Sequence, residues 1–194
     1  YDIMIGTQLI AKGLHFPNVT LVGVINADMI LSFPDFRAGE KTYQLITQAA
    51  GRAGRGDKKG KVIIQTYQPE NYVMEKIMKN DYEGFYNSEI EMRKILEYPP
   101  FSKIINIGIS SSNEEKLERT ARKLFEAVKK DYVEVYGPNK SLVYKVKDRY
   151  RENIFIKGNK KNIDYYKKEL EKILSEFNDE GCRIVVDVDP VNLI

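Results

Sequence analysis

The sequence has one cysteine, one histidine and no long apolar segment. A single cysteine, Cys182, excludes an internal disulfide and a cysteine-based zinc cluster, so we expect no metal site in this chain. The longest apolar runs reach about seven residues, well below the roughly twenty of a membrane-spanning helix. The first residues show no pattern of a secretory leader. These absences favour a reducing, cytoplasmic setting without a membrane partner.

Two nucleotide-binding motifs are also missing. The chain contains neither a G-x-x-x-x-G-K-[ST] phosphate loop nor an Asp-Glu-x-His magnesium motif. Residues 1–3 read as a strand already under way, with no cap or turn before them. We therefore expect a fragment of a larger protein. The net charge of +3 lies in residues 98–194, which is a weak indication of a basic, partner-facing surface.

An arginine- and glycine-rich segment occupies residues 48–56, with the sequence QAAGRAGRG. Arg52 and Arg55 are three positions apart, so on a helix end they share one face and can bind one anion. Gly51 and Gly54 keep bulk low, which lets a phosphate approach, and guanidinium groups bind phosphate through two donors. The alternative is a basic helix terminus that stops at a glycine.

A second polar segment follows an apolar run near the start of the chain. Residues 3–6 read as a strand, and a hydroxyl, an amide and a lysine follow on the next residues. Residues 20–26 form another continuous apolar run. Such runs joined by helical stretches indicate a parallel sheet, and polar groups after the strand ends are where these sheets bind ligands.

These two segments together resemble motifs V and VI of superfamily 2 helicases. The primosomal replication-restart branch is the closer match, on GTQLIAKGLHFP (6–17), DFRAGE (35–40), QAAGRAGR (48–55), YPPF (98–101) and VDVDP (186–190). The resemblance covers essentially the whole chain. A branch-migrating helicase of the RecG type would share the first two motifs but not the tail.

The resemblance implies roles for individual residues. Arg55 would be an arginine finger toward the γ-phosphate of ATP, Arg52 would share the phosphate charge, and Gln48 would sense nucleotide or water; Gly51 and Gly54 complete this ATP contact. The DNA-backbone contacts would be Gly6, Thr7, Gln8, Lys12 and Gly13. ATP and Mg²⁺ would be held mainly by a lobe upstream of Tyr1, and Zn²⁺ by a cysteine cluster there. Forked and single-stranded DNA, primosome proteins and single-strand-binding proteins are the implied partners.

Two positions stay open at this point. His15 stands where many helicases of the superfamily carry an Asp that couples nucleotide to nucleic acid. His15 therefore either has this coupling role or has no functional role. Residues 35–40 are either an ordinarily capped helix start or a loop that faces DNA.

The predicted elements divide at Tyr98-Pro99-Pro100-Phe101, because consecutive prolines cannot continue a helix. Residues 1–97 predict an α/β unit with a parallel sheet: strand, helix, strand, a loop at 28–38, a helix at 40–50, a strand at 61–66 and two further helices. By resemblance this is the second, RecA-like helicase lobe. Residues 98–194 predict a small α+β sandwich, in outline a ferredoxin-like variant. Its predicted strands are 103–110, 132–136, 142–146, 153–158 and 183–188, and its helices are 113–130 and 162–177.

A basic segment in the second part combines Lys145, Lys147, Arg149 and Arg151 with Tyr144 and Tyr150. If the segment is extended, the four cations lie on one face; if 148–149 is a hairpin turn, they cluster at its tip. Either geometry suits phosphate contacts and base stacking. The alternative is a lysine-rich strand edge that prevents aggregation. Asp187 and Asp189 have no third ligand and are read as structural.

Two functions follow. The first is part of an ATP-dependent DNA helicase that moves 3′ to 5′ and restarts replication at abandoned forks, with this fragment inactive alone. The second is a non-catalytic DNA-binding or partner-docking module whose arginines only bind phosphates.

Overall fold

The computed structural model describes residues 3–7, 18–54 and 59–193 of the chain. The chain divides into two compact units, residues 1–92 and residues 93–194. The domain boundary expected before Tyr98 stays a prediction. Among the described residues, no helix has both the length and the hydropathy needed to cross a bilayer.

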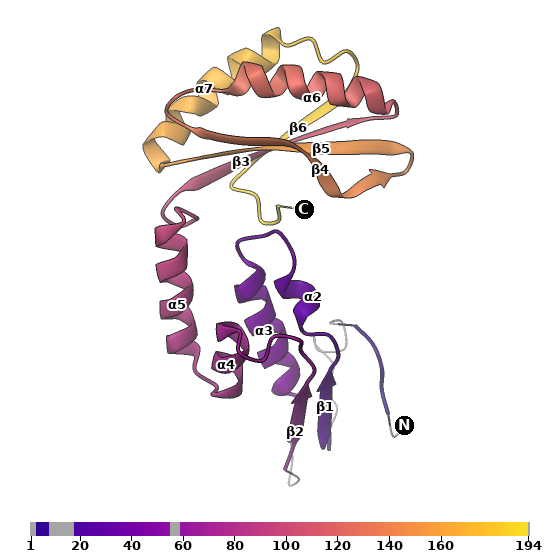
Figure 1. Ribbon diagram of the computed structural model, residues 1–194, viewed down its shortest axis with the longest axis vertical. Coiled ribbons are helices and arrows are strands. Elements are labelled where there is room, and N and C mark those ends of the chain that lie inside the picture. The colour runs from indigo at the N-terminus through magenta and orange to yellow at the C-terminus, as the bar shows by residue number, and fades with distance from the viewer. Residues whose placement is uncertain (1–2, 8–17, 55–58, 194) are drawn as a thin grey trace. The chain divides into compact units, whose positions relative to one another are not determined.

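The first unit is built on a pair of parallel strands (Figure 1). Its elements are β1 (Leu21–Val24), α2 (Asp28–Leu31), α3 (Ala38–Ala50), β2 (Lys61–Ile64) and α4 (Tyr72–Met78); α5 (Tyr82–Ile95) begins in this unit and ends in the second. β1 and β2 pair in parallel along their whole length. Ala27, Ile46 and Met74 form a buried cluster, against which Val24 and Ile64 pack. The strands expected near 20–26 and 61–66 and the helix at 40–50 are thereby confirmed.

A second cluster holds α4 and α5 to α3. Tyr43, Val73 and Phe85 are buried together, and the rings of Tyr43 and Phe85 stack with centroids 4.3 Å apart. Asn71 caps α4, because its side chain accepts the N–H of Val73 at 3.0 Å. The prediction of two helices before residue 97 is confirmed.

Two predictions in this unit are wrong. Residues 3–6 were expected to form a strand, but residues 3–7 belong to no helix or strand, and Ile3 and Ile5 are 81% and 89% exposed. An apolar run forms a strand only when a neighbouring strand accepts its hydrogen bonds, and no described strand pairs with it. The loop expected at 28–38 contains the short helix α2.

The second unit is a four-stranded antiparallel sheet with two helices on one face (Figure 1). Its elements are β3 (Lys103–Ser111), α6 (Glu114–Val128), β4 (Glu134–Val146), β5 (Arg149–Gly158), α7 (Lys160–Glu176) and β6 (Arg183–Val188). The strand order is β4-β5-β3-β6. Alternate residues of β3, with Ile107 at their centre, pack with Leu117 and Leu124 of α6 and Tyr166 of α7. The other face of the sheet, here called the open face, carries the remaining residues. The chain is thus a mixed α/β protein with one parallel and one antiparallel sheet.

One strand replaces two predicted strands in this unit. The expected strands at 132–136 and 142–146 are both parts of β4, which runs from Glu134 to Val146. Gly137 and Pro138 are residues that usually interrupt a strand. Here β4 continues through them, and its register against β5 shifts after Tyr136 and again after Lys140. Such irregularities depend on the partner strand, so the local sequence does not show them.

Candidate functional site

The arginine- and glycine-rich segment begins where α3 ends. Ala50 is the last helical residue, and Gly51 donates its N–H to the carbonyl of Thr47 at 2.9 Å. Arg52 donates its N–H to the carbonyl of Ala49 at 3.0 Å, which tightens the end of the helix. The helix therefore stops at Gly51 as predicted. Arg52 lies beyond the last residue of α3, so the expectation that it lies on a helical face is wrong.

The turn after α3 is fixed from two sides. Gly54 has a φ of 73° and donates its N–H to the carbonyl of Val19, just before β1, at 2.9 Å. A Cβ on Gly60 would lie 2.2 Å from the Gly54 nitrogen and 2.5 Å from the Ala53 carbonyl carbon. The backbone of Gly60 therefore packs directly on this turn, and two glycines make the packing possible.

The polar groups of this segment lie around the helix end. Gln48 is exposed in the last turn of α3, and Arg52 is half-buried after it. Arg55 lies outside the described residues. A cation at a helix C-terminus also offsets the helix dipole, so the observed position of Arg52 suits an anion contact and a structural role equally.

The other predicted helicase residues are only partly described. Gly6 and Thr7 are exposed and lie in no regular element. Gln8, Lys12, Gly13 and His15 lie outside the described residues, so the predictions made for them stay predictions.

Asp35 organises the start of α3. Its carboxylate accepts the N–H of Arg37 at 2.9 Å and pairs with the ammonium of Lys41 at 2.7 Å. Burial opposes ionisation of this group, but the hydrogen bonds from Lys41 and Arg37 outweigh it and lower the pKa of Asp35. The carboxylate fixes the turn before α3, whose N-cap residue is Arg37 with no capping hydrogen bond from its side chain. Both alternatives for residues 35–40 therefore stay predictions.

Asp28 is a buried carboxylate that sequence reasoning missed. It accepts the hydroxyl of Thr66 at 2.7 Å and the N–H of Tyr67 at 2.9 Å. These bonds, with Thr66 first, lower the pKa of Asp28. Asp28 therefore ties the segment after β1 to the segment after β2. Only the alignment of the two strands shows this role.

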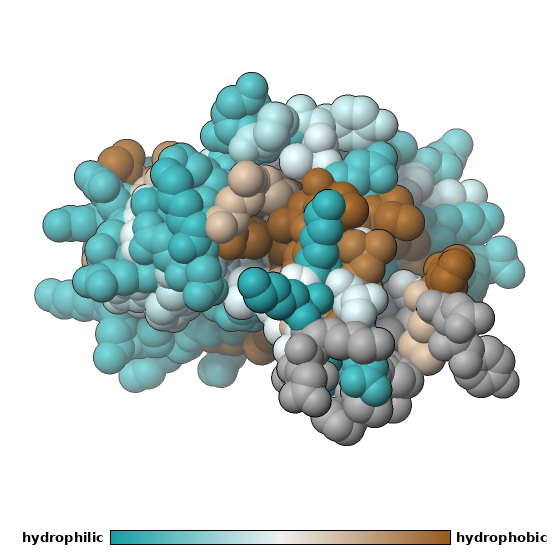
Figure 2. All heavy atoms as spheres, turned by 90° about the horizontal axis from the view of Figure 1, so that it is seen from below, coloured by the Kyte–Doolittle hydropathy of each residue, from teal (hydrophilic) through white to brown (hydrophobic). Residues whose placement is uncertain are grey.

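The outer surface of the strand pair carries exposed apolar side chains beside an exposed lysine, Lys61, which pairs with Leu21. Leu21 of β1 and Ile63 of β2 are 56% and 49% exposed. Figure 2 shows hydrophobic side chains gathered on the face of the molecule that is seen from below. A parallel strand pair with an uncovered apolar surface is unusual, because parallel sheets are normally buried on both faces.

The basic segment of the second unit forms a hairpin. β4 ends at Val146 and β5 begins at Arg149, so Lys147 and Asp148 make the turn, one residue earlier than the 148–149 alternative. Both turn residues have positive φ, 47° and 59°, as a two-residue hairpin requires. The extended alternative is wrong.

The basic side chains of the hairpin lie on different faces of the sheet and at the tip of the turn. Lys145 pairs across the strands with Tyr150, and its ammonium lies 4.8 Å from the centroid of that ring. Lys147 is exposed at the tip. Arg149 and Arg151, two residues apart on β5, share the open face. The basic residues therefore do not form one stripe.

The tyrosines of the hairpin are already engaged. Tyr144 and Tyr150 pack against the core with ring centroids 5.5 Å apart. The hydroxyl of Tyr144 donates to Glu114 at 2.8 Å, and the ammonium of Lys140 lies 4.3 Å from its ring centroid. Base stacking on these rings would need these contacts to change.

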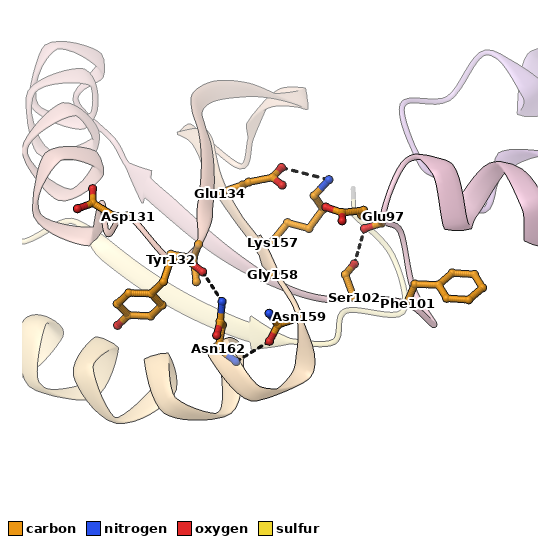
Figure 3. A pocket seen from close by; sticks show the side chains of 11 residues that line it. Glu97, Phe101, Ser102, Asp131, Tyr132, Glu134, Lys157, Gly158, Asn159 and Asn162 are labelled. Carbon is orange, nitrogen blue, oxygen red and sulfur yellow. Dashed lines mark hydrogen bonds and ion pairs between the residues drawn. The ribbon is translucent and has the colours of Figure 1, made fainter.

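A polar pocket of about 370 Å³ lies beside the start of α7 (Figure 3). Several of its polar groups form hydrogen bonds or ion pairs within the lining (Figure 3). Lys157 pairs with Glu134 at 3.1 Å, and Asn162 donates to the carbonyl of Tyr132 at 2.7 Å. Burial and a hydrogen bond to Glu169 raise the pKa of Tyr132 to about 12. This pocket could not be predicted from the sequence, because its lining comes from segments that are distant in the chain.

Asp187 and Asp189 are both exposed on β6 and just after it. Asp189 lies 3.8 Å from the ammonium of Lys103. Within the described ranges, no three His, Cys, Asp or Glu side chains come close enough together to hold a metal ion.

The two units define a class of protein: a mixed α/β protein with a basic turn after α3 in one unit and a basic hairpin in the other. The family model described as the primosomal protein N C-terminal domain matches residues 94–191, just over half of the chain. The chain belongs to this family. The resemblance inferred from its motifs is thereby confirmed.

Individual relatives match almost the whole chain. Replication restart protein PriA of Rickettsia felis is 44% identical over 193 residues, which are 97% of this chain and 29% of that protein. The Bacillus subtilis protein of the same name is 44% identical and matches 97% of this chain with 24% of its own length. The Borreliella burgdorferi protein is 37% identical across 100% of this chain and 30% of its own. The chain thus spans about a quarter to a third of these relatives.

Among solved structures, a de novo designed protein, Foldit4, matches 47% of this chain at 23% identity with a TM-score of 0.35. A similarity at this level does not support an assignment of the fold.

Proposed function

We propose that the chain is part of an ATP-dependent DNA helicase that moves 3′ to 5′, recognises stalled or abandoned forks and restarts replication by primosome assembly. The observation that carries this proposal is the match of relatives named replication restart protein PriA to 97% of the chain. The match includes the arginine segment and the C-terminal tail, which favours this family over helicases of the RecG type.

The first unit corresponds in this proposal to part of the second, RecA-like lobe. The parallel pair of β1 and β2, with α3 between them in the chain, supports this assignment. The exposed apolar residues Leu21 and Ile63 suit a strand pair that belongs to a larger sheet. The second unit corresponds to a ferredoxin-like domain, supported by its βαββαβ order and the strand order β4-β5-β3-β6.

The arginine segment supplies the phosphate contacts of the ATP site. ATP with Mg²⁺ would supply the phosphoryl transfer, and the remainder of the protein would hold the metal, its nucleotide and a Zn²⁺ cluster. Arg55 and Arg52 stabilise the charge that develops on the transferred phosphoryl group, while Gln48 positions water. Arg52 fits this role because it lies in a turn that Gly54 and Gly60 hold in place.

DNA contacts come from both units in this proposal. Gly6, Thr7, Gln8, Lys12 and Gly13 hold the backbone of a single strand without reading its sequence. The hairpin adds Lys145, Lys147, Arg149 and Arg151, whose charges favour phosphate. Closure of the ATP cleft moves the first set along DNA. The partners are forked and single-stranded DNA, primosome proteins and single-strand-binding proteins, in the cytoplasm.

The deciding experiment measures DNA-stimulated ATP hydrolysis by the complete protein that contains this chain. Arg55→Ala lowers turnover by about a thousandfold while DNA binding stays intact, because an arginine finger acts on the transition state. Arg122→Ala, an exposed arginine of α6, is the matched control and leaves turnover unchanged. Equal turnover of both variants and wild type would instead favour the non-catalytic DNA-binding module.

The 194-residue chain itself has no ATPase activity in this proposal. Measurable hydrolysis by the purified chain would contradict the assignment of the ATP-binding lobe to the remainder of the protein.

A further inference from the structure

Three arginines lie on the open face of the second sheet, at the end that carries the hairpin. Ser110 of β3 pairs with Arg151 of β5 on one side and with Arg183 of β6 on the other. Directly paired residues of antiparallel strands point to the same face, so Arg151, Ser110 and Arg183 form one row across three strands. The buried neighbour Ile109 points to the helices, which places this row on the open face.

The third arginine reaches the same row from the hairpin. The guanidinium of Arg149 donates to the carbonyl of Ser110 at 2.8 Å and to its hydroxyl at 3.3 Å. Arg149 is thereby held beside Ser110 by the sheet itself. Neighbouring strands are about 4.8 Å apart, so the Cα atoms of Arg151 and Arg183 are separated by about 10 Å. Arginine side chains span that distance, and all three guanidinium groups can contact one anion.

No carboxylate neutralises this cluster within the described part of the chain. Neither Arg151 nor Arg183 forms an ion pair there, and Asp148, in the turn, lies 3.7 Å from Lys145 instead. Asp187 shares the open face but is four residues from Arg183, about 13 Å along the strand. Arg119 of α6, by contrast, pairs with Glu180. Like charges on neighbouring strands of one face repel one another, and an anion bound between them would relieve that repulsion.

We propose that Arg149, Arg151 and Arg183 form a phosphate-binding site for the backbone of single-stranded DNA on the open face. The inference rests on the proposed DNA-binding function and adds Arg183, which lies 32 positions from Arg151 in the sequence. An open sheet surface suits an extended backbone, and guanidinium groups bind phosphate through paired donors. The site positions the strand and reads no sequence.

The test titrates a fluorescein-labelled dT20 oligonucleotide with the 194-residue chain and follows anisotropy at several salt concentrations. Arg183→Ala weakens binding about tenfold at low salt, because a hydrogen bond to a charged group is lost. The slope of log K against log salt decreases by about 0.7, the value for one phosphate contact on a single strand. Arg183→Lys keeps the charge and therefore most of the slope.

The control is Arg122→Ala, which removes an exposed arginine from α6, on the helix-covered side. It leaves affinity and slope unchanged. Circular dichroism and thermal unfolding confirm that Arg183→Ala folds, as expected for a residue on an exposed strand position.

Each other outcome overturns the proposal. If Arg183→Ala binds as tightly as Arg122→Ala while Lys147→Ala binds more weakly, the arginine site is wrong and DNA binding by the hairpin stands. If the wild-type chain binds no oligonucleotide, both the site and the proposed DNA binding of this chain fail.

Discussion

Glu180 joins the segment before β6 to α6 through two cations. Its carboxylate accepts hydrogen bonds from Arg119 and from Lys123, the latter at 2.7 Å. These bonds, with Arg119 first, lower the pKa of Glu180 from 4.5 to about 2. Because the folded-state pKa is lowered, the ionised group stabilises the fold above pH 4.5, and this contribution is lost as pH falls toward 2.

We expect Glu180→Gln to lower the melting temperature at pH 7 by a small amount, since both cations are more than half exposed and solvent screens the pairs. The difference from wild type shrinks between pH 5 and pH 2, as followed by circular dichroism. Glu171→Gln, on the exposed side of α7, is the control without an effect at either pH. A difference that stays constant down to pH 2 would refute the role of the ionised carboxylate.

Gly60 allows the turn after α3 to pack against the approach to β2. We expect Gly60→Ala to lower the free energy of unfolding by about 1–3 kcal/mol, because the added methyl group meets the backbone of Ala53 and Gly54. Urea unfolding measures the change. Gly23→Ala is the matched control: its Cβ would find no atom within 4 Å, so stability changes little. Equal effects of the two substitutions on the free energy of unfolding would show that the turn shifts to make room for the methyl group at no cost.

At the scale of elements, asparagine caps begin α4, α6 and α7. In α6 the side chain of Asn113 accepts the N–H of Lys116 at 2.9 Å. We expect Asn113→Ala to cost about 1 kcal/mol of unfolding free energy in urea titrations, while Asn113→Asp keeps the acceptor and most of the stability. Ser112→Ala, at the exposed preceding residue, is the control. A loss as large for Asn113→Asp as for Asn113→Ala would argue against capping.

The elements that the sequence predicted correctly carry their signals locally. Asn113 before an amphipathic segment and Gly51 after one are such signals, and the structure has α6 and α3 at these places. Predictions failed where a partner strand determines whether a segment forms a strand. Ile3 and Ile5 have no described neighbour to pair with, and β4 passes through Gly137 because β5 holds both of its halves.

The candidate site shows the same division at the scale of the whole molecule. Arg149 and Arg151 could be selected from the sequence, because they are close together among other cations. Arg183 could not, since only the position of β6 beside β3 brings it into their row. Asp28 was missed for a similar reason, because its partners Thr66 and Tyr67 lie beyond the next strand of the sheet.

Each unit has its own buried core, and this should be visible in unfolding. Leu124 belongs to the core of the second unit and Ile46 to that of the first; they are 0% and 3% exposed. Truncating either residue to alanine costs about 2–5 kcal/mol, because buried contacts are lost and a cavity remains. We expect differential scanning calorimetry of the wild-type chain to resolve two transitions, since neither core shares residues with the other.

Leu124→Ala then lowers the temperature of one transition and Ile46→Ala lowers that of the other. Leu142→Ala, at a position 54% exposed on β4, is the control and shifts neither transition by much. A single transition that both core variants shift equally would contradict independent units, because it would mean that loss of one core unfolds the other. Two separate transitions would show that each core stabilises its own unit without the other.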